Sequence, residues 1–289
     1  MEAERPIGLI AGSGRLPVLE AAGLRAAGRR VVCVAIGDGH DPDLPTLCDQ
    51  YAKAGILRLG RWARLLRRWG AEQAVMVGAV RKARMYDPFT ALKQVPDWRA
   101  FRLWYRVLRH DRRSQVLLAA LADELQSQGI ELIDTTRYIP EHLATVGVMT
   151  RTPPSAAQMA DIAFGWPILM RMNDLDIGQA IAVKGKDVIA VEAIEGTDGM
   201  IRRAGELCRS GGWVLLKGPK PDKDRRFDVP TVGVQTIESL KAAGGACLAV
   251  AAGSVILAEK GRVIAAADAA GIAIVGVETE TLINGNDRP

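Results

Sequence analysis

The sequence predicts an α/β fold in two domains. Its 289 residues exceed what one hydrophobic core usually holds, so two domains are the natural expectation. Hydrophobic residues make up 48% of the chain and charged residues 25%, as in an average soluble globular protein. Short apolar runs alternate with helix-like segments along the chain. This alternation favours sheets covered by helices. The composition excludes a disordered chain, a collagen-like repeat or a coiled coil.

The N-terminal elements indicate a parallel sheet in a Rossmann-like layer, because each expected strand except the last is followed by a helix. The expected strands are residues 7–11, 31–36, 74–78 and 130–133, and the expected helices are residues 16–27, 62–69, 98–109 and 114–128. We place the N-terminal domain at residues 1–134 and a Thr-, Pro- and Gly-rich linker at 135–154.

The C-terminal domain is expected at residues 155–289, with its own α/β pattern. It begins with a hairpin of strands 179–183 and 188–193, joined by a Lys-Gly-Lys-Asp turn. The remaining expected elements are helix 198–208, strand 213–217, a polar loop 218–233, helix 237–243, strand 246–250, helix 260–270 and strand 272–277.

Charge is unevenly distributed. The net charge is +5, but residues 53–113 hold 16 Lys and Arg against four acids, together with four of the six Trp. On a helical wheel, Trp98, Phe101 and Tyr105 form one stripe and Arg99, Arg102, Arg106 and Arg109 another. Such a helix lies on an anionic lipid surface, contacts a polyanion, or packs its aromatics into the core with the arginines solvated. No known motif frames a nucleic-acid site, so we expect no nucleic acid partner.

The chain shows neither a signal peptide nor a membrane span. The apolar run after the acidic N-terminus stops at Gly12, and the longest uncharged stretch is shorter than the ~20 residues that a spanning helix needs. Four Cys stand far apart and three His are scattered, which argues against a disulfide framework or a zinc site. We therefore expect a cytoplasmic protein.

A glycine-containing loop, Gly12-Ser13-Gly14, follows the first strand and opens a helix. Glycines there let backbone N–H groups approach a phosphate, and the helix N-terminus adds positive potential. Pro17 stands where the third glycine of a dinucleotide fingerprint belongs. The loop is therefore either a phosphate or nucleotide site or a tight turn.

Two polar segments of the C-terminal half are candidate sites. Three carboxylates, with Gly196 and Thr197, follow the expected hairpin over 192–198; they cap a helix or bind Mg²⁺. The loop after strand 213–217 mixes cations with acids: Lys217, Lys220, Arg225 and Arg226 with Asp222, Asp224 and Asp228. It is either a solvated surface loop or a site whose cations hold a diphosphate while a carboxylate binds metal or activates water.

Taken together, these segments resemble one family, the LpxI-type UDP-2,3-diacylglucosamine diphosphatases of lipid A synthesis. The resemblance is carried by the motifs Gly12-Ser-Gly-Arg-Leu-Pro17, Met159-Ala-Asp161, Asp176-Ile-Gly-Gln179, Val191-Glu-Ala-Ile-Glu-Gly-Thr-Asp198 with Arg202-Arg203, Lys217-Gly-Pro-Lys-Pro221, Arg226-Phe-Asp-Val-Pro-Thr-Val-Gly233 and Val263-Ile-Ala-Ala-Ala-Asp268. It implies two α/β domains with a lipid-bearing chamber between them. It also implies Mg²⁺-dependent hydrolysis of UDP-2,3-diacylglucosamine to UMP and 2,3-diacylglucosamine 1-phosphate (lipid X).

The resemblance assigns one role directly. The family's essential Asp falls on Asp228, which we expect to be the metal ligand or base. Beside it we expect Glu195 and Asp198 as further catalytic acids, with Asp198 as a second metal ligand. The expected substrate-binding residues are Gly12, Ser13, Gly14, Asp176, Gln179, Thr197, Lys217, Lys220 and Arg226. The lipid substrate implies transient contact with the inner membrane, and a homodimer is compatible with the sequence.

Two departures from the family pattern leave alternatives open. The family's Gly-Asp-Asp-Ala-Leu-Leu is replaced by Ser114-Gln-Val-Leu-Leu118, and its Gly-Asn-Val by Gly78-Ala-Val80. Loss of these polar groups fits a non-catalytic lipid- or nucleotide-binding homologue. A Rossmann-type nucleotide-dependent oxidoreductase is a further alternative.

Overall fold

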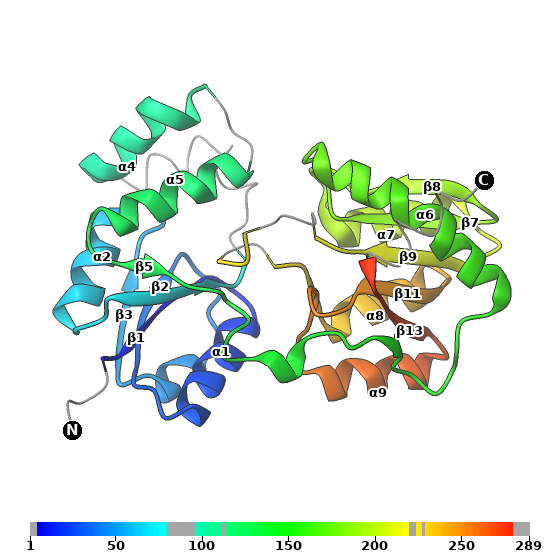
Figure 1. Cartoon of the computed structure of the whole chain (residues 1–289), viewed down its shortest axis with the longest axis horizontal. Coiled ribbons are helices and arrows are strands. Elements are labelled where there is room, and N and C mark those ends of the chain that lie inside the picture. The colour runs from blue at the N-terminus through cyan, green and yellow to red at the C-terminus, as the bar shows by residue number, and fades with distance from the viewer. Residues whose placement is uncertain (1–4, 80–95, 111–113, 220–223, 227–228, 280–289) are drawn as a thin grey trace. The chain divides into compact units, whose positions relative to one another are not determined.

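The computed structural model describes residues 5–79, 96–110, 114–219, 224–226 and 229–279. The chain divides into two compact units. The N-terminal unit is Met1–Ile139 together with Asp224–Asp228, and the C-terminal unit is Pro140–Lys223 with Val229–Pro289. Figure 1 shows the α/β architecture of each unit.

The N-terminal unit has a five-stranded parallel sheet, which confirms the expected fold class. Its strands are β1 (Ile7–Ala11), β2 (Val31–Ile36), β3 (Gln50–Ala54), β4 (Gln73–Val77) and β5 (Glu131–Leu132), in the order β3-β2-β1-β4-β5. β1 and β2 are apolar on both faces because helices cover both. The strand order reverses between β1 and β4, and such a switch point is the usual ligand position in a parallel sheet.

Helices cover both faces of this sheet (Figure 1). They are α1 (Leu16–Ala26), α2 (Leu59–Arg68), α4 (Trp98–Leu103), which continues as a π-helical turn over Trp104–Leu108, and α5 (Ser114–Gln126). Alternate side chains of β2 point to opposite faces of the sheet, and each face has its own hydrophobic cluster. Val32 and Val34 pack with side chains of α2 and α5, whereas Val31 and Cys33 pack with side chains of α1. A short 3₁₀ helix at Leu44–Leu47 precedes β3.

The C-terminal unit contains a six-stranded mixed sheet in the order β6-β13-β11-β9-β7-β8. Its strands are β6 (Gly147–Val148), β7 (Ala180–Lys184), β8 (Asp187–Val191), β9 (Trp213–Lys217), β11 (Gly245–Ala251) and β13 (Ala273–Val277). β9, β11 and β13 are parallel; β6, β7 and β8 join antiparallel. β10 (Thr231–Val232) and β12 (Ile256–Leu257) form a separate short pair.

The helices of this unit are α6 (Ala156–Asp174), α7 (Gly196–Leu207), α8 (Val234–Ala242) and α9 (Lys260–Ala270), with a 3₁₀ turn at Pro140–His142. A Cβ at Gly165 of α6 would lie 3.1 Å from the Leu216 side chain, so α6 packs on that face of β9. Trp213 points to the opposite face, where its Nε1 donates to the carbonyl oxygen of Ala243 after α8. α6 and α8 therefore cover opposite faces of the sheet.

Several elements, among them β3, α6 and β6, were not expected from the sequence. β3 is a partly exposed edge strand of mixed polarity, so it lacks the apolar run of its neighbours. α6 contains Gly165 and Pro167, which interrupt a helical pattern, although Ser155 and Gln158 form a capping box at its start. β6 lies within the expected linker and pairs with β13. No helix in the described part of the chain is both long and apolar enough to cross a membrane.

Candidate active site

Three strands of the C-terminal unit bring polar side chains to one edge of its sheet. β7 runs antiparallel to β9, so its first residue, Ala180, pairs with the last residue of β9, Lys217. Glu192 follows β8, and its backbone N–H donates to the carbonyl oxygen of Ala180 at 2.9 Å. Gln179, Glu192 and Lys217 therefore lie together at the carboxyl end of β9. The carboxyl ends of parallel strands are the usual position of ligand sites in such sheets.

A chain of hydrogen bonds connects three of these side chains. The Lys217 Nζ donates to Thr197 Oγ1 at 2.9 Å, and this hydroxyl donates to Glu192 Oε1 at 3.1 Å. Thr197 stands in the first turn of α7, which follows the β8 strand. Lys217 is only 3% exposed and Glu192 only 6%. We call Gln179, Glu192, Thr197 and Lys217 the Lys217 cluster.

This cluster combines a buried lysine with a buried carboxyl group. Burial raises the pKa of Glu192 above the ordinary glutamate range, while the nearby Lys217 charge and the Thr197 hydroxyl oppose that rise. The cluster thus holds one cation and one carboxyl group that gains and loses a proton closer to neutrality than an exposed glutamate does.

Two acceptors of the Lys217 cluster lack a partner within the described residues. They are Glu192 Oε2 and Gln179 Oε1, and both atoms are buried. Buried acceptors are normally satisfied, and a ligand, water or metal ion is the usual partner when the protein supplies none. The cluster is therefore suited to binding a polar group.

The other acids expected at this site lie around the cluster. Glu195 Oε1 accepts a hydrogen bond from Arg203 NH2 at 2.6 Å, so its charge is paired. Asp198 is exposed in the first turn of α7, where the helix dipole favours a negative charge. Asp176 follows α6 with φ of 56°, a left-handed backbone that Asp tolerates better than most residues.

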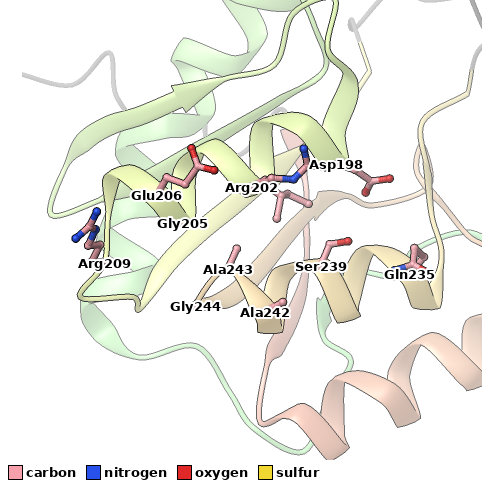
Figure 2. A pocket seen from close by; sticks show the side chains of 11 residues that line it. Asp198, Arg202, Gly205, Glu206, Arg209, Gln235, Ser239, Ala242, Ala243 and Gly244 are labelled. Atoms are coloured by element: carbon pink, nitrogen blue, oxygen red, sulfur yellow. The ribbon is translucent and has the colours of Figure 1, made fainter.

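A groove of about 780 Å³ lies between α7 and α8. Figure 2 shows Asp198, Arg202 and Ser239 among the side chains along it. The helices approach closely here, because a Cβ at Gly205 would lie 2.8 Å from Ala243. Asp198 is the one expected site residue among those that line this groove, and the Lys217 cluster does not line it.

The glycine loop of the N-terminal unit lies at the switch point between β1 and β4. Ser13 and Ala79 exchange backbone hydrogen bonds of 2.9 Å, and Ser13 Oγ also donates to the Ala79 carbonyl oxygen at 2.8 Å. A Cβ at Gly12 would lie 2.8 Å from the Gly78 carbonyl, so only glycine fits. The Ser13 hydroxyl thus bonds within the loop, while Gly14 is exposed at φ of 96°.

The remaining expected residues belong to the charged loop. Arg226 belongs to the N-terminal unit, and its guanidinium binds both carboxylate oxygens of Asp224. This pairing holds the pKa of Asp224 below its usual range. Lys220 and Asp228 lie outside the described residues. Among the residues that are described, no three His, Cys, Asp or Glu come close enough together to hold a metal ion.

The structure thus brings together Gln179, Thr197 and Lys217 of the expected substrate-binding residues and adds Glu192. The sequence placed Glu192 in the candidate segment 192–198 but gave it no role of its own. Its position carried a signal, because Glu192 is two residues after Ala190 and so shares the inward face of the expected strand 188–193. A carboxylate on a buried face is unusual and indicates a site.

Comparisons with known proteins match this organisation. The family model for the LpxI N-terminal domain matches residues 6–142, and that for the LpxI C-terminal domain matches residues 145–275. The UDP-2,3-diacylglucosamine pyrophosphatase LpxI of Caulobacter vibrioides is 34% identical over 288 residues, which covers 96% of this chain and 99% of that protein. These matches extend over both units and include the Lys217 cluster, so the chain belongs to the LpxI family.

Proposed function

We propose that this chain hydrolyses the diphosphate of UDP-2,3-diacylglucosamine to UMP and 2,3-diacylglucosamine 1-phosphate. The name of its Caulobacter relative, a UDP-2,3-diacylglucosamine pyrophosphatase, supports cleavage of that diphosphate. One observation supports this activity above the others. A buried lysine at the carboxyl end of β9 is connected through a threonine hydroxyl to a buried carboxyl group, and two acceptors beside it are open. The lysine fits a phosphate oxygen, and the two open acceptors fit a hydroxyl group, a water or a metal ion bound beside it.

The reaction consumes one water. Its oxygen forms a bond to one phosphorus, the bridging P–O bond breaks, and the bridging oxygen leaves on the other phosphate. Lys217 supplies a positive charge that stabilises the charge developing on the phosphates, and the Thr197 hydroxyl orients the lysine. Asp228, the residue that matches the family's essential aspartate, is proposed as the base that activates water or as a metal ligand.

Mg²⁺ is part of this proposal. When bound it neutralises charge on the diphosphate, and it usually takes only one or two carboxylates from the protein and the rest of its ligands from phosphate and water. Asp198, exposed at the start of α7, and Asp228 are the proposed ligands. A site that depends on substrate oxygens agrees with the lack of a three-ligand cluster among the described residues.

The surroundings of the Lys217 cluster also suit a substrate with acyl chains. Leu175, Ile177 and Ile194 are 71%, 48% and 87% exposed, and they lie in the two loops that flank Gly178 and Glu192. These loops touch, because a Cβ at Gly178 would lie 2.1 Å from the Glu192 carbonyl oxygen. Exposed apolar side chains beside a buried polar cluster fit a ligand with a charged head and an apolar tail.

Release of UMP tests this function. Purified protein with Mg²⁺ should release UMP from UDP-2,3-diacylglucosamine, and excess EDTA should stop the release. Asp228→Ala should remove most turnover, about 10²–10⁴-fold, while its melting temperature stays near that of the wild type. Folded protein that releases no UMP from substrates of several acyl-chain lengths would refute the activity and favour a non-catalytic lipid-binding role.

Two further parts of the proposal concern partners. Because the substrate is a lipid, we propose that the protein contacts the inner membrane transiently. We also propose a homodimer, which sedimentation velocity tests directly: one species at the mass of a 31.1 kDa monomer at all concentrations would refute it.

A further inference from the structure

The helix of the N-terminal unit that carries Trp98 presents its aromatic side chains to solvent. Trp98, Phe101, Trp104 and Tyr105 are 72%, 44%, 46% and 51% exposed. Their rings contact one another, with centroids of Trp98 and Phe101 at 5.7 Å and of Phe101 and Tyr105 at 6.3 Å. Packing of these rings into the core, one of the expectations from the sequence, is therefore wrong. We call these four residues the aromatic face of α4.

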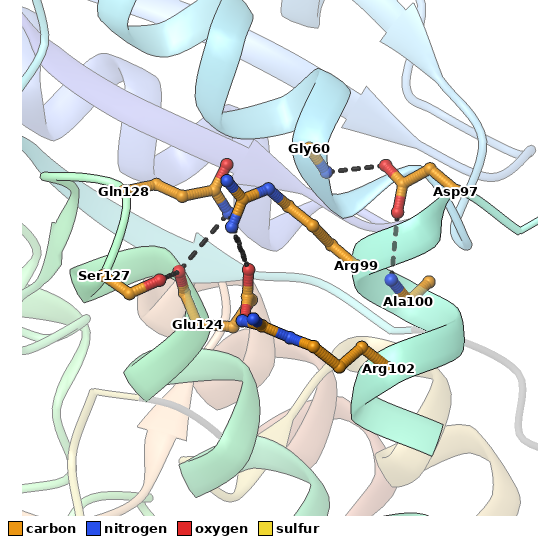
Figure 3. Close-up of polar contacts among 8 residues, drawn as sticks. All are labelled: Gly60, Asp97, Arg99, Ala100, Arg102, Glu124, Ser127 and Gln128. Carbon is orange, nitrogen blue, oxygen red and sulfur yellow. Dashed lines mark hydrogen bonds and ion pairs between the residues drawn. The ribbon is translucent and has the colours of Figure 1, made fainter. Parts of the chain in front are cut away.

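Two arginines are directed inward instead (Figure 3). Arg99 NH1 donates to Glu124 Oε1 at 2.6 Å, and Arg102 NH2 donates to Glu124 Oε2 at 2.9 Å. Glu124 belongs to α5 and is only 7% exposed. Burial alone would raise the pKa of Glu124, but the two guanidinium groups outweigh it and hold that pKa below the usual range. α4 is thus attached to α5 by two ion pairs.

The start of α4 is attached to α2 as well. Asp97 caps the helix by accepting from the Ala100 N–H at 2.9 Å, and its other carboxylate oxygen accepts from the Gly60 N–H at 2.7 Å (Figure 3). Ala100 is buried beneath the helix. Polar contacts therefore hold α4 in place on the side away from its aromatic face. The rings are exposed although the helix that carries them is firmly attached.

Exposed arginines accompany the aromatic face on its own helical segment and on the neighbouring helix. Arg106 and Arg109 are exposed on the same helical segment, and the Arg109 guanidinium lies 4.0 Å from the centre of the Tyr105 ring. The neighbouring helix α2 exposes four more arginines: Arg61, Arg64, Arg67 and Arg68. The one acid in α4 or its N-cap, Asp97, is used in the two hydrogen bonds above.

Exposed Trp and Tyr rings flanked by arginines have the chemistry of a membrane-interface anchor. Trp and Tyr favour the headgroup level of a bilayer, where the ring is apolar and its polar atom stays hydrated, and arginines attract anionic lipid. We propose that the aromatic face of α4 docks onto an anionic lipid bilayer. The choice of a bilayer rests on the proposed function, because a lipid substrate brings the protein to a membrane.

Vesicle flotation without substrate tests the docking surface separately from the activity. The protein should float with phosphatidylglycerol-containing vesicles at low salt and not at 1 M salt, where the Debye length falls to about 3 Å. It should bind phosphatidylcholine vesicles much more weakly. Tryptophan emission should shift to the blue on binding, because Trp98 and Trp104 are exposed whereas Trp62, Trp166 and Trp213 are already buried.

Two double variants separate the contribution of the arginine charges from that of the aromatic rings. R106Q/R109Q should weaken binding about 30-fold, since each arginine near an anionic surface contributes ~1 kcal/mol. F101S/Y105S should abolish flotation and the blue shift. Val146→Ser, which removes a 61% exposed apolar side chain from the other unit, is the control and should bind as the wild type does. All variants should keep the wild-type melting temperature and release UMP from a short-chain, water-soluble substrate at the normal rate.

Two results would overturn the proposal. The first is equal flotation of the wild type and F101S/Y105S. The second is a change of oligomeric state alone: the wild type is a dimer, F101S/Y105S is a monomer, and both bind vesicles equally. The aromatic face would then be covered by a second copy of the chain. If the wild-type protein binds vesicles but releases no UMP, the proposed function is refuted and the docking surface is not.

Discussion

Replacing Lys217 by Met removes the cation of the Lys217 cluster and keeps most of the side-chain volume. Thr197 then loses a 2.9 Å hydrogen bond from a charged donor, a contact worth about 1.5–3 kcal/mol. Glu192 loses the positive charge that opposes its burial, so its pKa should rise further. Each unit of that rise costs the ionised form about 1.4 kcal/mol. We therefore expect K217M to be less stable by ~2 kcal/mol at about pH 8 and by less at about pH 5, where a larger fraction of Glu192 carries a proton.

The same change should act on the reaction. Without the ammonium group, charge that develops on the diphosphate loses a fixed counter-charge, and such a loss typically lowers the rate about 10²–10³-fold. Urea unfolding at both pH values and UMP release at saturating Mg²⁺ measure the two effects on one preparation.

Lys184→Met is the matched control. Lys184 ends β7 in the same sheet and donates to Ser210 Oγ at 2.8 Å and to the Gly211 carbonyl oxygen, away from the Lys217 cluster. K184M should therefore lose stability but keep its rate. A K217M protein that turns over like the wild type, or an equal rate loss in K184M, would refute the role given to Lys217.

Three other substitutions test separate parts of the structure by urea unfolding. Because burial raises the pKa of Glu192, the folded state keeps that proton to higher pH than the unfolded chain does. The wild type should therefore lose stability relative to E192Q as the pH rises from about 4 to 8. A difference in unfolding free energy that does not change with pH would contradict the burial argument. G12A should cost about 1–3 kcal/mol because its Cβ meets the Gly78 carbonyl, whereas G261A, with open space around it, should cost nothing. E124Q should lose about 1–3 kcal/mol at neutral pH, and the loss should shrink as acid protonates Glu124; an unchanged E124Q would show that α4 is held by other contacts.

Much of the fold could be predicted because its central strands are apolar throughout. β1, β2 and β9 are short runs whose residues are almost all buried, and the helices between them follow a regular pattern. The hairpin β7–β8 was also predicted correctly and is confirmed. β3 was missed because its polar and apolar residues reflect an edge position rather than a core strand. α6 was missed because Pro167 and Gly165 are normally breakers, and only its packing on β9 overrides them.

The residues of the site could be predicted from the sequence, but the contacts between them could not. Lys217, Thr197 and Gln179 could be named from their motifs, whereas the hydrogen bonds that join Lys217 to Glu192 through Thr197 depend on the register of β7 against β9. The pairing of Glu195 with Arg203 could not be inferred either, because it depends on where α7 begins. Likewise, the inward turn of Arg99 depends on Glu124, which is 25 residues away in the sequence.

Phosphorus-31 NMR of the reaction tests the central claim, hydrolysis of the substrate diphosphate, most directly. With UDP-2,3-diacylglucosamine, Mg²⁺ and the purified chain, the two coupled diphosphate signals should disappear together. Two phosphomonoester signals, those of UMP and of the sugar 1-phosphate, should grow in equal amounts, since one water divides one diphosphate. A spectrum that keeps both diphosphate signals while the folded protein is present, or one that gains inorganic phosphate instead of the two monoesters, would contradict the proposed function.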